Sequence, residues 1–329
     1  MSKVIRFEQT GDPEVLTIHD EEVPAPAKGE IQIQVSAIGL NRAEAMFRRG
    51  QYLEAPDLPA RIGYEASGTV KAIGEGVEGF RVGDAVSTIP NFSMNHYGVY
   101  AEVTNVPASA VAFYPGNLSW EEAASVWMQY LTAYGALIDI ARIQPDDYVL
   151  IPAASSSVGL AAIQLCNLMG AIPIAMTRTT DKKQFLLDHG APFVVVSQDE
   201  DVVARVENIT SGYGVRVVFD PVGGPMLETL AEVTGKHGII FQYGALSPEA
   251  TPFPLFSVLA KGLTIRGYTL FEFTTDPLHL PTARDAIYGW LESAQLKPVI
   301  AKTFPLDDIV EAHRYLESNS QLGKIVVTV

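Results

Sequence analysis

The stretch from Val149 to Cys166 combines a buried strand, a turn of small residues and an apolar helix. In a dinucleotide-binding fold, the first such turn presents backbone N–H groups of the helix N-terminus to a pyrophosphate. Three serines, Ser155 to Ser157, fill the turn, and of the usual glycines only Gly159 is present. Serine is small enough for a phosphate to approach closely, and its hydroxyl can donate to the phosphate. It can equally be an ordinary helix cap.

Two basic residues follow at the distance where a dinucleotide fold holds the adenosine ribose. An acidic residue that binds the ribose hydroxyls is expected about 20 residues after the turn. Counting 19 residues from Gly159 reaches Arg178 instead, and Lys182 follows it. Their cationic side chains would bind a 2′-phosphate, which a carboxylate would repel. The pattern therefore predicts NADPH rather than NADH, against the alternative of a solvated turn with ordinary surface cations.

Two more turns end buried strands farther along the chain, at 217–224 and 239–247. The carboxyl ends of parallel strands are where such sheets place ligands. Each turn by itself could be only a loop, but all are expected at one edge of the sheet. The cofactor contacts predicted from the turns and strand ends are Ser155, Ser156, Ser157, Val158, Gly159, Thr177, Arg178, Lys182, Val222, Gly223, Tyr243, Gly244 and Ala245.

An alternation of strand and helix patterns positions these turns. After a helix-like stretch at 121–140, the sequence predicts strands at 148–151, 172–176, 193–196, 215–219, 238–241 and 263–265, with helices at 158–169, 182–189 and 199–210. Such alternation is typical of βαβ units wound around a parallel sheet. The second half of the chain is therefore expected to be an α/β domain with a doubly wound sheet.

The first third of the chain is different in character. Short β-type runs at 4–7, 16–18, 30–38, 69–73, 85–87 and 97–106 are separated by Gly and Pro, with one helix at 41–49. This pattern predicts a compact, largely antiparallel β domain. The tail predicts helices at 282–293 and 307–318 and a closing strand at 324–329. We expect that strand to rejoin the first domain, which would make the domain discontinuous.

The composition of the chain excludes several classes of function. The 329 residues suggest roughly two domains, and the net charge is 23 − 38 = −15, which argues against a nucleic-acid partner. The single cysteine, Cys166, excludes intrachain disulfides and a multi-cysteine zinc site, and it favours a cytoplasmic protein. The start has no apolar run of signal-peptide length, and no stretch of about 18 apolar residues predicts a membrane span.

A set of short motifs runs through the whole chain in a particular order and spacing. The motifs occupy Gly39–Arg42, Gly63–Gly68, Phe80–Asp84, Leu131–Gly135, Ala153–Gly159, Asp220–Gly224, Leu263–Gly267 and Gly323–Val326. In these motifs the chain resembles the medium-chain dehydrogenase/reductase superfamily, in its zinc-free quinone oxidoreductase branch. The resemblance implies a GroES-like, β-rich catalytic domain at 1–124 with 270–329. A Rossmann NADP-binding domain at 125–269 would interrupt it, with the active site between the two.

The resemblance also implies roles for individual residues. Metal-dependent relatives carry a zinc-ligand cysteine where Asn41 stands and a ligand histidine where Tyr64 stands, so no metal is expected. Asn41 and Tyr52 would lie beside the nicotinamide. Tyr64 or Tyr52 would donate to the substrate oxygen, against the alternative that both merely pack. Thr132 and Lys324 are implied along the cofactor.

Without a metal Lewis acid, such an enzyme suits hydride delivery to an electron-poor acceptor. The leading hypothesis is therefore an NADPH-dependent reductase of quinones or α,β-unsaturated carbonyls. The resemblance further suggests a homodimer through the strand at Leu263–Tyr268, because an apolar edge strand needs covering.

Two alternatives remain at this point. An enoyl-thioester reductase would need a basic patch, for which Arg42, Arg48, Arg49 and Arg61 are the candidates. A weakly catalytic NADPH-binding protein, like crystallin or RNA-binding relatives, is disfavoured on the RNA side by the acidic charge. Zinc-dependent alcohol dehydrogenation ranks last, because its ligands are missing.

Overall fold

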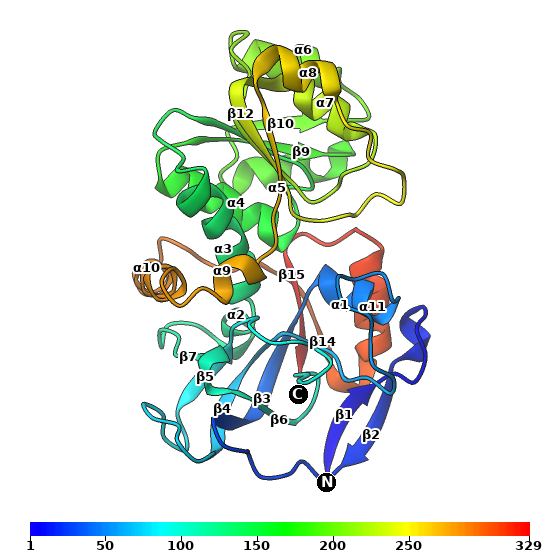
Figure 1. The fold of residues 1–329 in the computed structure, drawn as a ribbon, viewed down its shortest axis with the longest axis vertical. Helices are drawn as coiled ribbons and strands as arrows, with labels where there is room; N and C mark the ends of the chain where they lie inside the picture. The colour runs from blue at the N-terminus through cyan, green and yellow to red at the C-terminus, as the bar shows by residue number, and fades with distance from the viewer. The chain divides into compact units, whose positions relative to one another are not determined.

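The computed structural model covers residues 1–329 and divides into two compact units (Figure 1). Unit 1 comprises 1–128 and 285–329, and unit 2 comprises 129–284. The sequence placed the two junctions after residues 124 and 269. No helix of the structure has the length and apolar character that a membrane crossing requires.

Unit 1 is built on a seven-stranded sheet with the order β14-β15-β3-β4-β5-β7, in which β6 also pairs with β3. The strands are β3 (Glu30–Leu40), β4 (Glu65–Ile73), β5 (Ala85–Thr88), β6 (Val103–Pro107), β7 (Val111–Ala112), β14 (Ile300–Pro305) and β15 (Lys324–Thr328). A separate antiparallel pair joins β1 (Ser2–Arg6) and β2 (Thr17–Glu21). All pairs except β14 with β15 are antiparallel, which confirms the predicted β domain.

The closing strand does rejoin the first domain. β15 pairs antiparallel with β3, with Val326 opposite Gly39, so the red C-terminal strand lies in the sheet of the blue N-terminal strands (Figure 1). The helices of unit 1 are α1 (Arg42–Arg48), α2 (Trp120–Ala123) and α11 (Ile309–Glu317), with 3-10 turns at Pro13–Val15, Ala108–Ala110 and Leu306–Asp308. The helix α10 (Leu280–Glu292) spans the second junction.

Unit 2 is a six-stranded parallel sheet with the order β10-β9-β8-β11-β12-β13. Its strands are β8 (Tyr148–Ile151), β9 (Ile172–Thr177), β10 (Phe193–Val196), β11 (Val215–Asp220), β12 (Thr234–Gln242) and β13 (Thr264–Gly267). Its helices are α4 (Ser157–Leu168), α5 (Lys183–Asp188), α6 (Val202–Ile209), α7 (Met226–Val233), α8 (Leu255–Lys261) and α9 (Phe271–Thr274), with a 3-10 turn at Thr180–Lys182. The predicted doubly wound α/β domain is confirmed.

The helix-like stretch at 121–140 is helical for most of its length, but it is not one continuous helix. The stretch contains α2, then α3 (Trp127–Tyr134), then a π-helical segment at Gly135–Ile140. Ser119 starts α2 with a capping box, accepting from Glu122 N at 3.2 Å. At the start of α3, Met128 N donates to the Glu65 carboxylate at 2.8 Å rather than to a helical carbonyl. This contact with Glu65 therefore satisfies an N–H in the first turn of α3 that the helix itself leaves unpaired.

Candidate functional site

The strand order of unit 2 reverses between β8 and β11. From β8 the chain proceeds outward through β9 and β10, and from β11 it proceeds in the other direction through β12 and β13. In open α/β sheets, ligands bind beyond the carboxyl ends of the strands at such a switch point. The turns predicted to hold the cofactor follow β8, β11 and β12, so the topology brings them to this one edge.

The serine turn after β8 leads directly into α4. Ser156 is the N-cap, and its hydroxyl accepts a hydrogen bond from Gly159 N at 3.1 Å. Ser157 and Val158 are the first helical residues, whose N–H groups have no partner within the helix and suit an anion. A Cβ on Gly159 would lie 2.5 Å from Ala154 O, so this position requires glycine. One of the three serines is thus a cap, and the turn retains the N–H groups that a phosphate needs.

The basic residues lie at the end of the neighbouring strand β9. Lys182 Nζ donates to Ser155 Oγ at 3.2 Å, so it reaches back to the serine turn. Partial burial lowers the pKa of Lys182 from its ordinary value. Arg178 is exposed directly after Thr177, the buried last residue of β9. The structure therefore brings the predicted phosphate turn and the predicted 2′-phosphate residues together.

The turn after β11 is organised by Asp220. Its carboxylate accepts hydrogen bonds from Val222 N at 2.8 Å and Gly223 N at 3.0 Å. Burial raises the pKa of Asp220, against the effect of these two bonds. Gly223 and Gly224 both adopt positive φ, +67° and +69°, which favours glycine at both positions. The carboxylate therefore holds its own turn, and it is not offered to a ligand.

Two buried polar atoms at the end of β12 lack partners. The hydroxyl of Tyr243 and Oε1 of Gln242 are enclosed but make no hydrogen bond. The Tyr243 ring stacks on Phe219, with centroids 4.0 Å apart, and Gly244 packs so closely on Pro221 that a Cβ would lie 2.7 Å from its carbonyl oxygen. Buried polar groups are normally paired, so this edge fits a ligand with polar groups of its own. The predicted Ala245 follows in the same turn.

In unit 1, Asn41 lies in a buried cluster of charged side chains. Lys324 Nζ donates to Asn41 Oδ1 at 2.6 Å and forms an ion pair with Glu65. Asn41 Nδ2 donates to Glu65 Oε2 and to Glu44 Oε1, both at 3.1 Å. Both ends of the Asn41 amide are therefore engaged within the protein. The Lys324 side chain is fully enclosed, and its predicted contact with the cofactor stays a prediction.

Glu44 is the second carboxylate of this cluster. It accepts from Asn41 N at 2.6 Å and from Tyr64 N at 3.2 Å. Complete burial raises the pKa of Glu44 to about 7, because a charge loses hydration there. The hydrogen bond to Tyr64 N fixes the backbone of that tyrosine relative to α1.

The two predicted tyrosines are joined by a hydrogen bond between their hydroxyls. Tyr64 is buried and its ring packs on Phe92, with centroids 5.6 Å apart. Tyr52 is the more exposed of the two. Burial raises the pKa of Tyr52 to about 12 and raises that of Tyr64 further still. Both phenols stay protonated, and the arrangement in which Tyr64 donates to Tyr52 is the one that leaves the Tyr52 proton free for an external acceptor.

Comparison with known proteins identifies the family. The model described as "Alcohol dehydrogenase GroES-like domain" matches residues 27–116, and the model described as "Zinc-binding dehydrogenase" matches residues 157–282. Quinone oxidoreductase 1 of Escherichia coli is 33% identical over 98% of both chains. The chain belongs to the medium-chain dehydrogenase/reductase superfamily, in its quinone oxidoreductase-like branch. The predicted family and fold class are confirmed.

Solved structures of this superfamily are similar along their whole length. A crystal structure of Escherichia coli quinone oxidoreductase complexed with NADPH has a TM-score of 0.93 and 32% identity, covering 99% of this chain and 100% of that one. A structure named as an NAD-dependent alcohol dehydrogenase has a TM-score of 0.92, also at 32% identity, with 99% of each chain covered. The similarity therefore fixes the architecture, while these two relatives differ in the cofactor and activity that their names give.

Two predictions taken from the family are the absence of a metal and the contact of Thr132 with the cofactor. No three His, Cys, Asp or Glu side chains are grouped so as to hold a metal ion, and Asn41 and Tyr64 are engaged as described above. A zinc-free enzyme stays a prediction. Thr132, implied by the family along the cofactor, is a nearly buried residue of α3 in unit 2.

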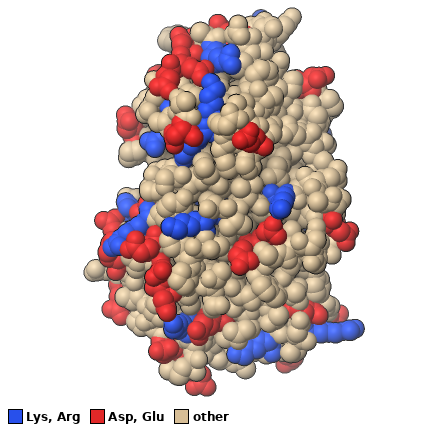
Figure 2. Space-filling view, turned by 180° about the vertical axis from the view of Figure 1, so that it is seen from behind, with Lys and Arg blue, Asp and Glu red and all other residues tan.

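The arginines of the enoyl-thioester alternative are all committed within unit 1. Arg48 pairs with Glu317 and donates to Gly11 O, and Arg49 pairs with Glu317 and Asp12. Arg42 donates to Leu316 O at 2.9 Å and to Asn319 Oδ1, and Arg61 pairs with Glu21 at 3.0 Å. Figure 2 shows basic and acidic side chains intermingled on its face rather than a broad basic area. A basic patch for a phosphorylated carrier is therefore not formed by these residues.

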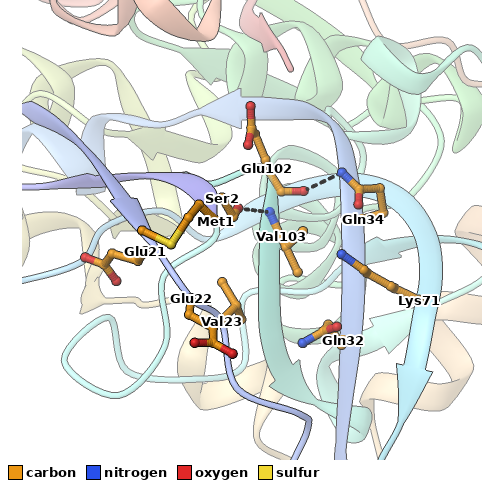
Figure 3. Close-up of a pocket in the computed structure, with 10 residues that line it drawn as sticks. All are labelled: Met1, Ser2, Glu21, Glu22, Val23, Gln32, Gln34, Lys71, Glu102 and Val103. Atoms are coloured by element: carbon orange, nitrogen blue, oxygen red, sulfur yellow. Dashed lines mark hydrogen bonds between the residues drawn. The ribbon is translucent and has the colours of Figure 1, made fainter.

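A separate hollow of about 330 Å³ lies in unit 1 between the N-terminus and the strands β2, β3, β4 and β6 (Figure 3). Its polar groups are largely engaged: Ser2 Oγ accepts from Val103 N, and Gln34 Nε2 donates to Glu102 O. Glu21 is held by Arg6 and Arg61, which lower its pKa to about 2. The hollow contains none of the predicted site residues.

The predicted site residues do not include Glu44, Glu65 or Glu54. Glu44 could have been found, because Asn41 followed by Glu44 at the third helical position is a capping-box pattern, and the bond from Asn41 N to the Glu44 carboxylate is present. Glu65 follows Tyr64 directly in the motif 63–68, but nothing local indicates its partner Lys324, which lies 259 residues away.

Proposed function

We propose that this protein is an NADPH-dependent, zinc-independent reductase that delivers hydride to a quinone or an α,β-unsaturated carbonyl. The observation that carries the proposal is the pairing of the Tyr52 and Tyr64 hydroxyls, in which Tyr52 is the more exposed residue. Reduction of such acceptors places negative charge on an oxygen. A prepositioned donor stabilises that charge without reorganisation.

The predicted site residues have separate roles in binding the cofactor and the acceptor. The nicotinamide supplies the hydride when it is bound. The N–H groups of Ser157 and Val158 bind the pyrophosphate, and Arg178 and Lys182 bind the 2′-phosphate. Tyr52 donates a hydrogen bond to the acceptor oxygen while Tyr64 donates to Tyr52. The proton that completes the product comes from solvent, because a phenol whose pKa is about 12 stays protonated.

Three features support NADPH reduction over the alternatives. The cations at the end of β9 suit a phosphate, and the named relatives include a quinone oxidoreductase complexed with NADPH. The paired state of Arg42, Arg48 and Arg49 disfavours an enoyl thioester with a phosphorylated carrier.

The substrate class is tested by NADPH absorbance with quinones, small enones and crotonyl thioester. We expect turnover of a quinone or an enone, and a large loss in Tyr52→Phe. Preference for the thioester would support the first alternative, and NADPH binding without turnover of any acceptor would support the second. Stoichiometric, tightly bound zinc in the purified protein would contradict the metal-free mechanism.

The cofactor preference is tested by Arg178→Ala. We expect the Kd for NADPH to rise about tenfold, which is about 1.4 kcal/mol, while the Kd for NADH stays unchanged. Arg216→Ala is the matched control, because Arg216 is an exposed arginine of β11 that makes no ion pair. Equal wild-type affinities for NADPH and NADH would refute the preference.

We also infer a homodimer formed through β13, the edge strand of the unit 2 sheet. An uncovered sheet edge invites pairing with another chain. The neighbouring helix α8 adds exposed apolar side chains, with Phe256 84% and Leu259 69% exposed, which is unusual on a monomer surface. Light scattering should give twice the mass of the 35.6 kDa chain; a monomer at working concentration would refute the inference.

A further inference from the structure

Two loops of unit 1, at 51–61 and 91–97, are fastened together by Glu54. Its Oε2 accepts a hydrogen bond from Ser93 Oγ at 2.6 Å, and its Oε1 accepts one from Met94 N at 3.0 Å. Bonds to a carboxylate are about twice as strong as those between neutral groups. Each oxygen of Glu54 therefore engages the opposite loop.

Asn95 fastens the same two loops from the other side. Its Nδ2 donates to Ala55 O at 2.9 Å, and its Oδ1 accepts from Asp57 N at 2.8 Å. Its own N–H donates to Ser93 Oγ at 3.1 Å, so the Glu54 and Asn95 contacts form one network. We call the side chains of Glu54, Ser93 and Asn95 the clasp.

Each of the fastened loops supports one member of the tyrosine pair. Tyr52 lies two residues before Glu54, in the first loop. Phe92, in the second loop, packs its ring on Tyr64 at 5.6 Å and on Tyr97 at 5.8 Å. The charge of Glu54 also acts on both hydroxyls, raising the pKa of Tyr52 and of Tyr64. The clasp therefore fixes the loop of Tyr52 to the loop that packs against Tyr64.

Tyr52 needs such support because its own loop offers little burial. Gln51, Leu53 and Ala55 are exposed, with Leu53 at 75%. A catalytic group must be held within about 0.5 Å of its productive position, and a misplacement of about 1 Å can cost about a hundredfold in rate.

We propose that Glu54 and Asn95 are positioning residues, which hold the Tyr52 hydroxyl where it meets the acceptor oxygen. The inference rests on the proposed function, because it assigns Tyr52 the donor role. Neither residue touches the acceptor itself. Their effect on turnover therefore passes entirely through Tyr52.

A double-mutant cycle tests this dependence. We expect Glu54→Ala to lower kcat between tenfold and about a hundredfold in the wild-type background, and less than twofold in the Tyr52→Phe background. Glu54→Gln keeps an acceptor oxygen for Met94 N and should retain most of the activity. Glu78→Ala is the matched control, since Glu78 is exposed and makes no hydrogen bond or ion pair. An equal loss in both backgrounds would overturn the proposal, because it would show that the clasp does not act through Tyr52.

Amide hydrogen exchange supplies a readout that does not depend on turnover. In Glu54→Ala and in Asn95→Ala, exchange at 51–61 should accelerate while exchange in β9 of unit 2 stays unchanged. Unaltered exchange at 51–61 would overturn the proposal whatever the activity. If the wild-type protein reduces no quinone or enone, the proposed function fails, and the clasp's role with it. If the wild-type protein does turn over such an acceptor and the double-mutant cycle is additive, only the positioning role of the clasp is refuted.

Discussion

The candidate residues of unit 2 and those of unit 1 are built in different ways. In unit 2 the predicted contacts are mostly backbone groups and small side chains at strand ends, in the turns after β8, β11 and β12. In unit 1, Asn41, Glu44, Glu65 and Lys324 are interlocked and buried, and the tyrosine pair is held by the surrounding loops. In unit 2 the order of the strands brings the candidate residues together, whereas in unit 1 networks of side-chain hydrogen bonds and ion pairs hold them.

The difference has an energetic consequence. A backbone cradle costs the fold little, because its N–H groups belong to a helix N-terminus that any helix leaves unpaired. A buried ion cluster takes charges out of water, and the loss of one partner leaves the other uncompensated. Substitutions in the buried ion cluster of unit 1 should therefore affect stability, and those in the turns of unit 2 should affect ligand binding.

The largest expected effect is that of Lys324→Met. The substitution leaves the Glu65 carboxylate, which is 1% exposed, without its cation. We expect the free energy of unfolding to fall by about 3–5 kcal/mol, measured by urea denaturation. Lys71→Met, at an exposed lysine of β4, should change it by less than about 0.5 kcal/mol.

The double variant Lys324→Met/Glu65→Gln sharpens the result. Removing both charges should recover most of the lost stability, because the remaining carboxylate, Glu44, whose pKa is already raised to about 7 by burial, stays protonated once Lys324 is gone. If Lys324→Met cost less than about 1 kcal/mol, the cluster would not be the energetic core of unit 1, and the contrast between the two units would be lost.

The second effect concerns pH. His313 in unit 1 is fully buried and neither ring nitrogen has a partner. Burial, with the charges of Arg48 and Arg42, lowers the pKa of His313 from 6.5 to about 3. Between these values the unfolded chain binds a proton that the folded chain excludes, so stability falls as the pH falls below 6.5. From pH 7 to pH 5 this group should remove about 2 kcal/mol.

His313→Leu isolates that contribution. When the pH falls from 7 to 5, the unfolding free energy of wild type should fall by about 2 kcal/mol relative to that of His313→Leu. Glu44, whose raised pKa makes it oppose His313 in this range, is present in both proteins and cancels. A constant difference across the range would show that the pKa of His313 is the same in the folded and the unfolded chain.

The extent to which the sequence predicted each unit follows from the same contrast. The order of strands and helices in unit 2 could be predicted, because buried parallel strands and glycine turns are local patterns. The serine turn and Arg178 could be found by spacing alone. The helix at 41–49 and the existence of the closing strand at 324–329 were also predictable from local signals.

What could not be predicted depends on contacts between distant segments. Glu54 meets Ser93 across 39 residues and Glu65 meets Lys324 across 259, and no local pattern encodes either pairing. The start of α3 inside the helix-like stretch 121–140 is likewise bonded to a distant residue, because Met128 N donates to Glu65. Asn41 and Tyr64 could be named from the family, but their engagement in hydrogen bonds required the fold.

The smallest expected effect is that of Gly159→Ala, which tests the unit 2 side of the contrast. Its Cβ would lie 2.5 Å from Ala154 O, closer than van der Waals contact, so the serine turn must shift away from the first N–H groups of α4. We expect the Kd for NADPH to rise about tenfold, or about 1.4 kcal/mol, by fluorescence titration. Gly116→Ala, where a Cβ meets nothing within 4 Å, is the control. Unchanged affinity would mean that the turn does not hold the phosphates. Faster amide exchange at 51–61 in Gly159→Ala would mean that the two units do not respond to substitution independently.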